Sequence, residues 1–217
     1  MALPVAHVIN LDRCPDNWAQ MQTTWSSIFN LQRVSAIDGR AYGYSGREAC
    51  RMSHIVLLKK LSSRTEPFQI VLEDDVYPTG SFSTQWPAIL KFLNSGRCDW
   101  DFIVLDPIVQ YENPQLDVFT PELFTITGSR ATGGIIYRTE FLKEHITTIA
   151  KARGAIDMSL TQNRAFRKLT PQQLLVRQHA GKPSLTSGTQ DTTYYNDFYD
   201  NTEAYLAAAR AIQSRLD

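Results

Sequence analysis

The sequence has no excess of charge of either sign, few cysteines and no long hydrophobic run. Its 22 basic residues balance 22 acidic residues over a length of 217, so the formal net charge is zero. Because broad binding to nucleic acid or to an anionic membrane relies on a positive surface, this balance argues against both partners. No stretch approaches the roughly 20 apolar residues that cross a bilayer, so we expect no transmembrane segment.

The cysteines and the N-terminal residues indicate in which cellular compartment the protein is located. Cys14, Cys50 and Cys98 are an odd number of cysteines without the spacing of a metal site, which favours free thiols in a reducing environment. Residues 1–11 have no basic leader and too short an apolar stretch for a secretory signal, and they fit a first strand better. We therefore expect a location in the cytoplasm or at the cytoplasmic face of a membrane.

Strand-like and helix-like segments alternate along the first 105 residues. Strands are expected at residues 4–11, 31–37, 67–72 and 102–105, and helices from residue 15 or 16, over 46–61 and near 84–93. This alternation predicts βαβ units, and hence an α/β fold with a central, mainly parallel mixed sheet flanked by helices. A chain of this length can form one domain with a sizeable core.

The second half of the chain has shorter segments. We expect a strand or hairpin arm at 118–127, strands at 134–137 and 174–176, and helices at 139–151 and 157–169. Residues 184–201 are polar and aromatic, which is typical of a loop or an extended tail, and apolar residues between 205 and 216 recur at helical spacing. The prediction is one domain over residues 1–185, with 186–217 either part of it or a connector to a further domain.

An acidic cluster follows the most apolar of the expected strands. Glu73, Asp74 and Asp75 come directly after residues 70–72, where like charges repel and raise one another's pKa. A hard divalent cation such as Mn²⁺ or Mg²⁺ would offset that repulsion and leave positions for phosphate. Ligands of open α/β sheets bind at the carboxyl ends of the strands. The alternative is an exposed acidic turn before Tyr77.

Several short segments occur in an order that is typical of one enzyme family. They are residues 8–13 (VINLDR) with 15–16 (PD) and 36–39 (AIDG), then 46–50 (GREAC) with 53–54 (SH), then 71–76 (VLEDDV), and more weakly 132–137 (TGGIIY) and 156–157 (ID). With them, residues 5–185 resemble family 25 glycosyltransferases, the lipooligosaccharide and collagen galactosyltransferase type. A virally encoded member would fit the divergent C-terminal third.

The resemblance implies a GT-A type fold and a nucleotide-sugar donor, by preference a UDP-sugar, bound through Mn²⁺ or Mg²⁺. Glu73, Asp74 and Asp75 stand where the family has its Asp-x-Asp-like motif. Asp75 is then the direct metal ligand, Glu73 binds the donor ribose or a metal-bound water, and Asp74 supports either. His179 completes the metal shell or is a solvated loop histidine.

The remaining donor-site candidates lie in the loops after the first two strands and in the second helix. They are Asn10, Leu11, Asp12, Arg13, Asp38, Gly39, Ser53 and His54. Arg13 pairs with phosphate or stays at the surface, and Asp38 with Gly39 contacts base or ribose or forms a simple turn. His54 is a site residue or a structural helical histidine.

Two carboxylates compete for the role of catalytic base toward a hydroxyl of a glycan or glycoprotein acceptor. Asp157 matches the family segment and could equally cap a helix, and Asp106 follows a core strand. Retaining and inverting chemistry both stay open. Two other classes are a metal-dependent phosphohydrolase or nuclease, which also clusters carboxylates, and a nucleotide-sugar-binding module without catalysis.

Overall fold

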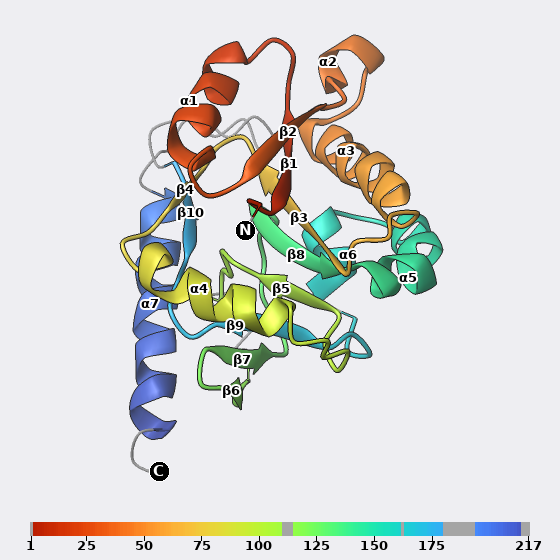
Figure 1. The fold of residues 1–217 in the computed structure, drawn as a ribbon. Helices are drawn as coiled ribbons and strands as arrows, with labels where there is room; N and C mark the ends of the chain where they lie inside the picture. The colour runs from red at the N-terminus through yellow and green to blue at the C-terminus, as the bar shows by residue number, and fades with distance from the viewer. Residues whose placement is uncertain (1, 110–114, 162, 180–193, 214–217) are drawn as a thin grey trace.

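The structure is a computed structural model that describes residues 2–109, 115–161, 163–179 and 194–213. Its centre is an eight-stranded sheet (Figure 1). In spatial order the strands are β2 (Asn30–Ser35), β1 (Val5–Asn10), β3 (Phe68–Glu73), β8 (Gly134–Arg138), β5 (Phe102–Val104), β9 (Lys168–Pro171), β7 (Leu123–Ile126) and β6 (Leu116–Thr120).

The sheet is mixed. β1 runs parallel to β2 and β3, and β5 runs parallel to β9. β8 is antiparallel to both β3 and β5, and β7 is antiparallel to β9 and β6. Six of the eight strands therefore share one direction, with β7 and β8 opposed. A separate antiparallel pair joins β4 (Val76–Pro78) to β10 (Val176–Gln178).

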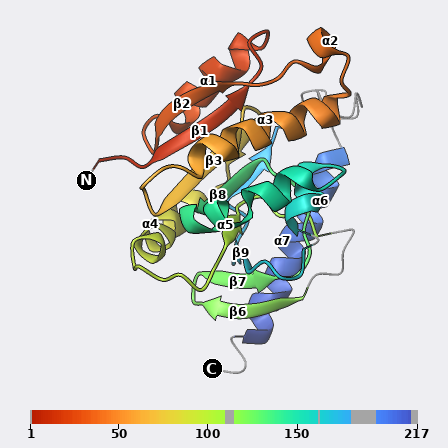
Figure 2. The ribbon, with the colours of Figure 1, turned by 90° about the vertical axis from the view of Figure 1, so that its right-hand side faces the viewer.

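Helices cover both faces of the sheet. One face carries α1 (Pro15–Trp25) and α4 (Phe82–Leu93), and the other carries α3 (Gly46–Leu61), α5 (Thr139–Lys151) and α6 (Ile156–Thr161). Figure 2 shows α3, α5 and α6 together on the side that faces the viewer. The short α2 (Gly39–Tyr42) precedes α3, and α7 (Tyr194–Gln213) is the last helix. This mainly parallel mixed sheet with helices on both faces is the α/β architecture that the sequence predicts.

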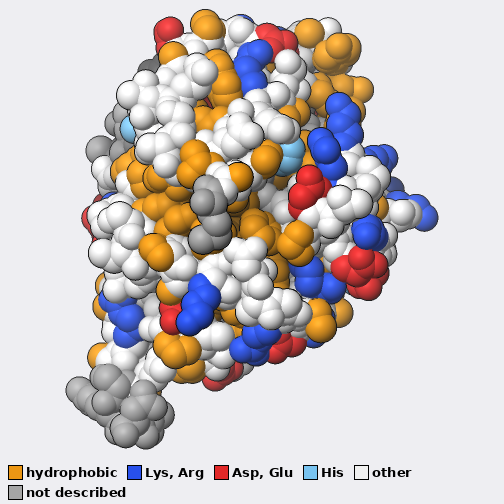
Figure 3. Space-filling model, viewed as in Figure 1, with side chains coloured by type: hydrophobic (Ala, Val, Ile, Leu, Met, Phe, Trp, Pro, Cys, Tyr) orange, Lys and Arg blue, Asp and Glu red, His pale blue; other side chains and the backbone are white. Residues whose placement is uncertain are grey.

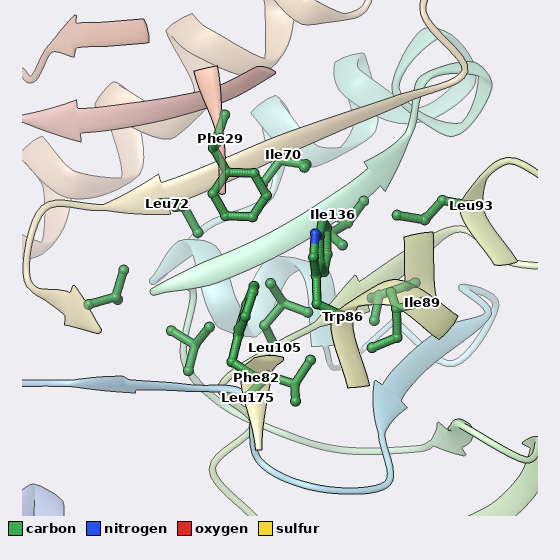
Figure 4. Packing of buried hydrophobic residues seen from close by; sticks show 14 of the residues in the cluster. Phe29, Ile70, Leu72, Phe82, Trp86, Ile89, Leu93, Leu105, Ile136 and Leu175 are labelled. Atoms are coloured by element: carbon green, nitrogen blue, oxygen red, sulfur yellow. The ribbon is translucent and has the colours of Figure 1, made fainter. Parts of the chain in front are cut away.

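Alternation along β3 divides the core into two halves. Ile70 and Leu72 pack toward α1 and α4 with Trp25 and Trp86, as Figure 4 shows in part. Val71 points to the opposite side and joins the cluster of α3 and α5. Successive side chains of a strand point to opposite faces. Glu73, the last residue of β3, therefore points to the same face as Val71, toward α3.

The C-terminal helix packs on the rest of the domain. Phe198 and Tyr199 of α7 form a buried cluster with Ile108 and Leu174, and Arg210 donates to the carbonyl of Gln172 at 2.9 Å. Within the described residues, no helix combines the length and apolarity that crossing a bilayer requires.

The expected elements agree with the structure over the first 105 residues, apart from the short α2 and β4, and differ in three later places. The helix predicted over 157–169 is wrong beyond Thr161, because residues 168–171 form the buried strand β9. The loop predicted over 184–201 is wrong from Tyr194 onward, where α7 begins, and 180–193 lie outside the described residues. The last strand occupies 176–178 instead of 174–176, because it pairs with the unexpected β4.

A large apolar groove lies at the N-terminal ends of β1 and β3. It has a volume of about 670 Å³, and its lining includes Pro4, Ile28, Trp86 and Leu90. Figure 3 shows hydrophobic side chains gathered on this side of the molecule. The acidic cluster stands at the other ends of the same strands, so the two features lie at opposite edges of the sheet.

Candidate functional site

A cavity of about 420 Å³ opens at the carboxyl ends of β1, β2 and β3. Such a volume suits a small-molecule ligand, and the carboxyl edge is where open α/β sheets bind ligands. Ten of the predicted site residues contribute to its lining, which they share with Cys14, Cys50, Tyr44 and Gln178. The ten are Leu11, Arg13, Asp38, Gly39, Ser53, His54, Glu73, Asp74, Asp75 and His179.

Glu73 ends β3 and points toward α3, as the alternation along the strand requires. Its Oε1 accepts hydrogen bonds from His54 Nε2 at 3.0 Å and from Thr132 Oγ1 at 2.8 Å. Burial by itself raises the pKa of Glu73, but the hydrogen bonds of His54 and Thr132 outweigh it and hold the pKa below its ordinary value. Glu73 is therefore an ionised carboxylate held largely by protein groups.

Asp75 is the acid of the cluster that follows the turn after β3, and its pKa is raised. The chain turns after Glu73, so Asp75 does not continue the strand. Burial, together with the charges of Glu73 and Asp74, raises its pKa to about 8. The amide of Gln178 lies 3.5 Å from Asp75 Oδ1 and 3.4 Å from Glu73 Oε2. A divalent cation at Asp75 would offset the repulsion that keeps this carboxyl protonated.

Asp74 turns toward β1. Its Oδ2 accepts a hydrogen bond of 2.5 Å from Asn10 Nδ2. Asn10 Oδ1 in turn accepts from Arg33 Nε at 2.7 Å, and Arg33 also pairs with Asp12 at 2.7 Å. This chain of polar contacts fixes the orientation of the Asn10 amide, but neither Asn10 nor Asp12 belongs to the cavity lining.

The loop after β2 is held by two hydrogen bonds to Asp38. Asp38 accepts from Arg13 Nε at 2.7 Å and, as the N-cap of α2, from the backbone N–H of Arg40 at 3.1 Å. The Arg40 N–H and then the Arg13 guanidinium hold the pKa of Asp38 below its ordinary value. Gly39 is buried, and a Cβ there would lie 2.6 Å from the Tyr44 carbonyl oxygen. Asp38 and Gly39 therefore begin the short helix α2 instead of forming a simple turn, and both line the cavity.

Ser53 joins this loop to α3. Its Oγ accepts from the backbone N–H of Ile37 at 2.8 Å and donates to the carbonyl of Ala49 at 2.7 Å. Both polar functions are thus used to position the protein itself. His179 stands at another edge of the cavity, where its ring packs on Tyr77 with centroids 4.6 Å apart and its Nε2 meets the amide of Gln20.

Asp106 lies behind the cavity. It is 0% exposed, its Oδ1 accepts from the Gly134 N–H at 3.0 Å, and its Oδ2 has no hydrogen-bond partner among the described residues. Burial, followed by the charges of Glu73 and Asp75, raises its pKa well above the ordinary value. A base role for Asp106 stays a prediction, and it would require a rearrangement that exposes the carboxyl.

Asp157 lies at the beginning of α6, on the α3 side of the site. Its Oδ1 accepts from the Met158 N–H at 2.7 Å. Burial raises the pKa of the Cys50 thiol most, followed by the charges of Glu73, Asp75 and Asp157. Asp157 is the second residue of α6 and not its N-cap, and a site role for it stays a prediction.

The sequence interpretation missed three polar residues as site residues. Thr132 and Gln178 bind the acidic cluster from segments 59 and 105 residues away, and Arg33 orients Asn10 from β2. The only sequence signal was indirect, because Thr132 belongs to the weak family segment and Gln178 is next to His179.

The profile of Glycosyltransferase family 25 (LPS biosynthesis protein) matches residues 44–169, more than half of the chain. The chain belongs to glycosyltransferase family 25. The match contains the α3 segment with Ser53 and His54, the acidic cluster, Asp106 and Asp157. Membership of this family makes the protein a glycosyltransferase. It does not by itself identify the metal, the sugar donor or the acceptor.

Several solved structures are similar to this glycosyltransferase at low identity. One is a glycosyltransferase involved in the glycosylation of the major capsid of PBCV-1, with 8% identity and a TM-score of 0.41 over 78% of this chain and 81% of that one. Another is S. aureus TarS 1-349, with 11% identity and a TM-score of 0.41 over 83% and 61% of the two chains. UDP-glucose pyrophosphorylase complexed with UDP-glucose shows 11% identity and a TM-score of 0.44 over 91% and 81%. No curated protein sequence matches the chain.

Proposed function

We propose that this glycosyltransferase moves a hexose from a UDP-sugar to a hydroxyl of a glycan or glycoconjugate, with Mn²⁺ or Mg²⁺ at Asp75. The observation that carries the proposal is the Asp75 carboxyl, partly buried beside two other acids at the edge of the 420 Å³ cavity, with its pKa raised to about 8. A carboxylate in such a place is stabilised when a cation replaces its proton.

The residues present fit a hard cation. Asp75 supplies a carboxylate, and Gln178, whose amide nitrogen donates to Asp75 Oδ1 in this structure, would have to turn its amide to offer its oxygen to the ion. Oxygen ligands of this kind suit Mg²⁺ and Mn²⁺. When bound, the metal supplies charge that neutralises the leaving diphosphate. Glu73 belongs to the surrounding shell in this proposal, since His54 and Thr132 occupy its Oε1.

The other end of the cavity suits the nucleoside. Ile9, Leu11 and Ala36 give it apolar walls on which a base can lie, and Arg13 and Asp38 stand beside them with charged groups. Arg13 is placed to reach a phosphate if it exchanges its ion pair with Asp38. His179 and Gln178 would close the site on the diphosphate side.

Asp157 is our proposed acceptor-side carboxylate. It lies on α6 next to the α3 wall, and its role there would be to accept the proton of the acceptor hydroxyl or to orient that hydroxyl. We expect the Asp157→Asn variant to bind the sugar donor normally but to lose transfer of the sugar to the acceptor. Analysis of the anomeric configuration of the product by NMR would decide between retention and inversion.

Isothermal titration of UDP-, GDP- and CMP-sugars, each with and without Mn²⁺, tests the donor and the metal together. We expect a UDP-sugar to bind only with Mn²⁺, and Asp75→Asn to weaken that binding on the order of a hundredfold or more. Glu140→Gln is the matched control, because Glu140 is an exposed acid on α5 that pairs with Lys143.

Three results would contradict the proposal. Metal-dependent donor binding that survives in Asp75→Asn would remove Asp75 from the metal site. Rapid release of phosphate or cleavage of nucleotides without sugar transfer would favour a phosphohydrolase or nuclease. Donor binding without turnover on any acceptor, unchanged by Asp157→Asn, would favour a binding module.

A further inference from the structure

A second group of metal-ligating side chains adjoins the acidic cluster. Cys50 and His54 lie four residues apart on α3 and so share one face of that helix. Glu73 meets them from the end of β3. The three ligand atoms, a thiol sulfur, an imidazole nitrogen and a carboxylate oxygen, all lie within 4.8 Å of one another.

We propose that Cys50, His54 and Glu73 form a binding site for a borderline or soft divalent cation such as Zn²⁺, separate from the hard-cation position at Asp75. Thiolate and imidazole ligands prefer Zn²⁺, Co²⁺ and Cd²⁺ to Mg²⁺, which prefers oxygen. The two positions therefore select different ions by their chemistry, although they are neighbours in the fold.

The spacing of the three atoms is close to what such an ion needs. Zn–S bonds of about 2.3 Å and Zn–N or Zn–O bonds of about 2.0–2.2 Å put tetrahedral ligands roughly 3.3–3.8 Å apart. His54 Nε2 lies 3.0 Å and Cys50 Sγ 4.0 Å from Glu73 Oε1. Coordination would replace the hydrogen bond between His54 and Glu73, and small side-chain rotations would bring the three atoms around one ion, while Thr132 can still donate to the Glu73 carboxylate.

The charges also match. One thiolate, one carboxylate and a neutral imidazole compensate a dication, so the loaded site is neutral in a place where His54 is 1% exposed. Binding displaces the thiol proton of Cys50, which leaves to solvent. All three residues line the 420 Å³ cavity, so an ion can enter and a water can occupy the fourth position.

Titration of Co²⁺ into the reduced, metal-free protein tests the site without any assay of sugar transfer. We expect one Co²⁺ per chain, with a thiolate-to-cobalt charge-transfer absorption and the visible bands of tetrahedral cobalt. Zn²⁺ should displace the Co²⁺, because it binds such ligands more tightly, and excess Mn²⁺ should not.

The variants separate this site from other thiols and from the proposed hard-cation position. Cys50→Ser should abolish the charge-transfer absorption, and His54→Gln should weaken Co²⁺ binding about tenfold or more, with circular dichroism confirming that both variants fold. Cys14→Ser and Cys98→Ser should retain the full signal, since Cys14 lines the cavity at another wall and Cys98 is exposed.

Asp75→Asn should also retain the cobalt signal, so failure of the proposed UDP-sugar function would leave this inference standing. The inference is overturned if the charge-transfer absorption persists in Cys50→Ser, if Cys98→Ser removes it, or if Co²⁺ binds only with octahedral spectra. Displacement of Co²⁺ by stoichiometric Mn²⁺ would equally overturn it.

Discussion

At the scale of single residues, three adjacent acids have three different environments. Glu73 is ionised because His54 and Thr132 donate to it, whereas burial raises the pKa of Asp75 to about 8. Asp74 is bound to Asn10. Behind them, Asp106 is buried with its pKa raised. The neighbours of each carboxyl, more than its residue type, decide its charge.

Asp106→Asn should change the pH dependence of stability. The pKa of Asp106 in the folded protein lies above its ordinary value of 3.8, so the folded state holds a proton that the unfolded state loses. The stability that this proton contributes is present below pH 3.8 and is lost as the pH rises toward the folded pKa, at about 1.4 kcal/mol per pH unit.

Because asparagine does not titrate, the variant should gain stability relative to the wild type between pH 5 and pH 8. Urea unfolding at both pH values, in the presence of a chelator, measures this difference. Parallel pH dependences of the two proteins would show that Asp106 is not protonated in the folded state.

Gly133→Ala should destabilise the fold. A Cβ at Gly133 would clash with the Asp106 carboxylate and would lie 2.8 Å from Val76 Cγ1. Overpacking of this kind costs about 1–3 kcal/mol, which thermal unfolding would detect. Gly80→Ala is the control, because no heavy atom lies within 4 Å of a Cβ there, and equal stability of the two variants would contradict the expectation.

At the scale of elements, one arginine of α3 holds two other helices. Arg51 donates to the carbonyls of Ile149, Ala150 and Ala152 at the end of α5 and to Ser159 Oγ of α6 at 2.8 Å. The last carbonyls of a helix lack intrahelical partners, so this side chain caps α5. It also anchors α6, which carries Asp157.

Arg51→Ala should lower the free energy of unfolding by about 2–4 kcal/mol, since several partly buried carbonyls lose their donor. Arg47→Ala is the matched control, because Arg47 is exposed one turn earlier on the same helix. Hydrogen exchange should show that α6 opens more readily in Arg51→Ala alone. Unchanged protection of α6 would argue that its own packing is sufficient.

One misprediction has a clear physical cause. The helix expected over residues 157–169 includes residues 168 and 169, yet both are buried in β9 between β5 and β7. A strand buried on both faces shows no alternation, so its pattern does not differ from that of a buried helix end. By contrast, α3 begins with a capping box between Ser45 and Glu48, a local signal that needs no partner segment.

At the scale of the whole molecule, the two ends of the parallel strands differ in chemistry. The carboxyl ends hold the polar cavity with its acids, and the amino ends hold the apolar groove. α7 reaches the polar end from the far end of the chain, because the Tyr199 hydroxyl accepts from the Gln178 N–H at 3.3 Å. Gln178 is the residue that lies between Glu73 and Asp75.

Tyr199→Phe should therefore lower stability by about 1–3 kcal/mol, since the Gln178 N–H loses its acceptor in a buried place. If the proposed donor site is correct, metal-dependent donor affinity should fall as well. Chemical denaturation and calorimetry measure the two effects. Tyr42→Phe, at an exposed tyrosine of α2, should change neither, and equal behaviour of both variants would contradict the link between α7 and the site.

The sequence by itself determined the alternation of strands and helices, the family, and the edge of the sheet at which the acids lie. The alternation follows from local periodicity, the family from a resemblance carried by short motifs in a fixed order, and the edge from the rule that ligands bind at carboxyl ends of strands. Only the tertiary structure decided that Glu73 meets His54 and Thr132 and that Asp74 meets Asn10. The physical reason is that hydrogen-bond partners 19 to 64 residues apart in sequence meet only when the sheet forms, and local patterns contain no information about such contacts.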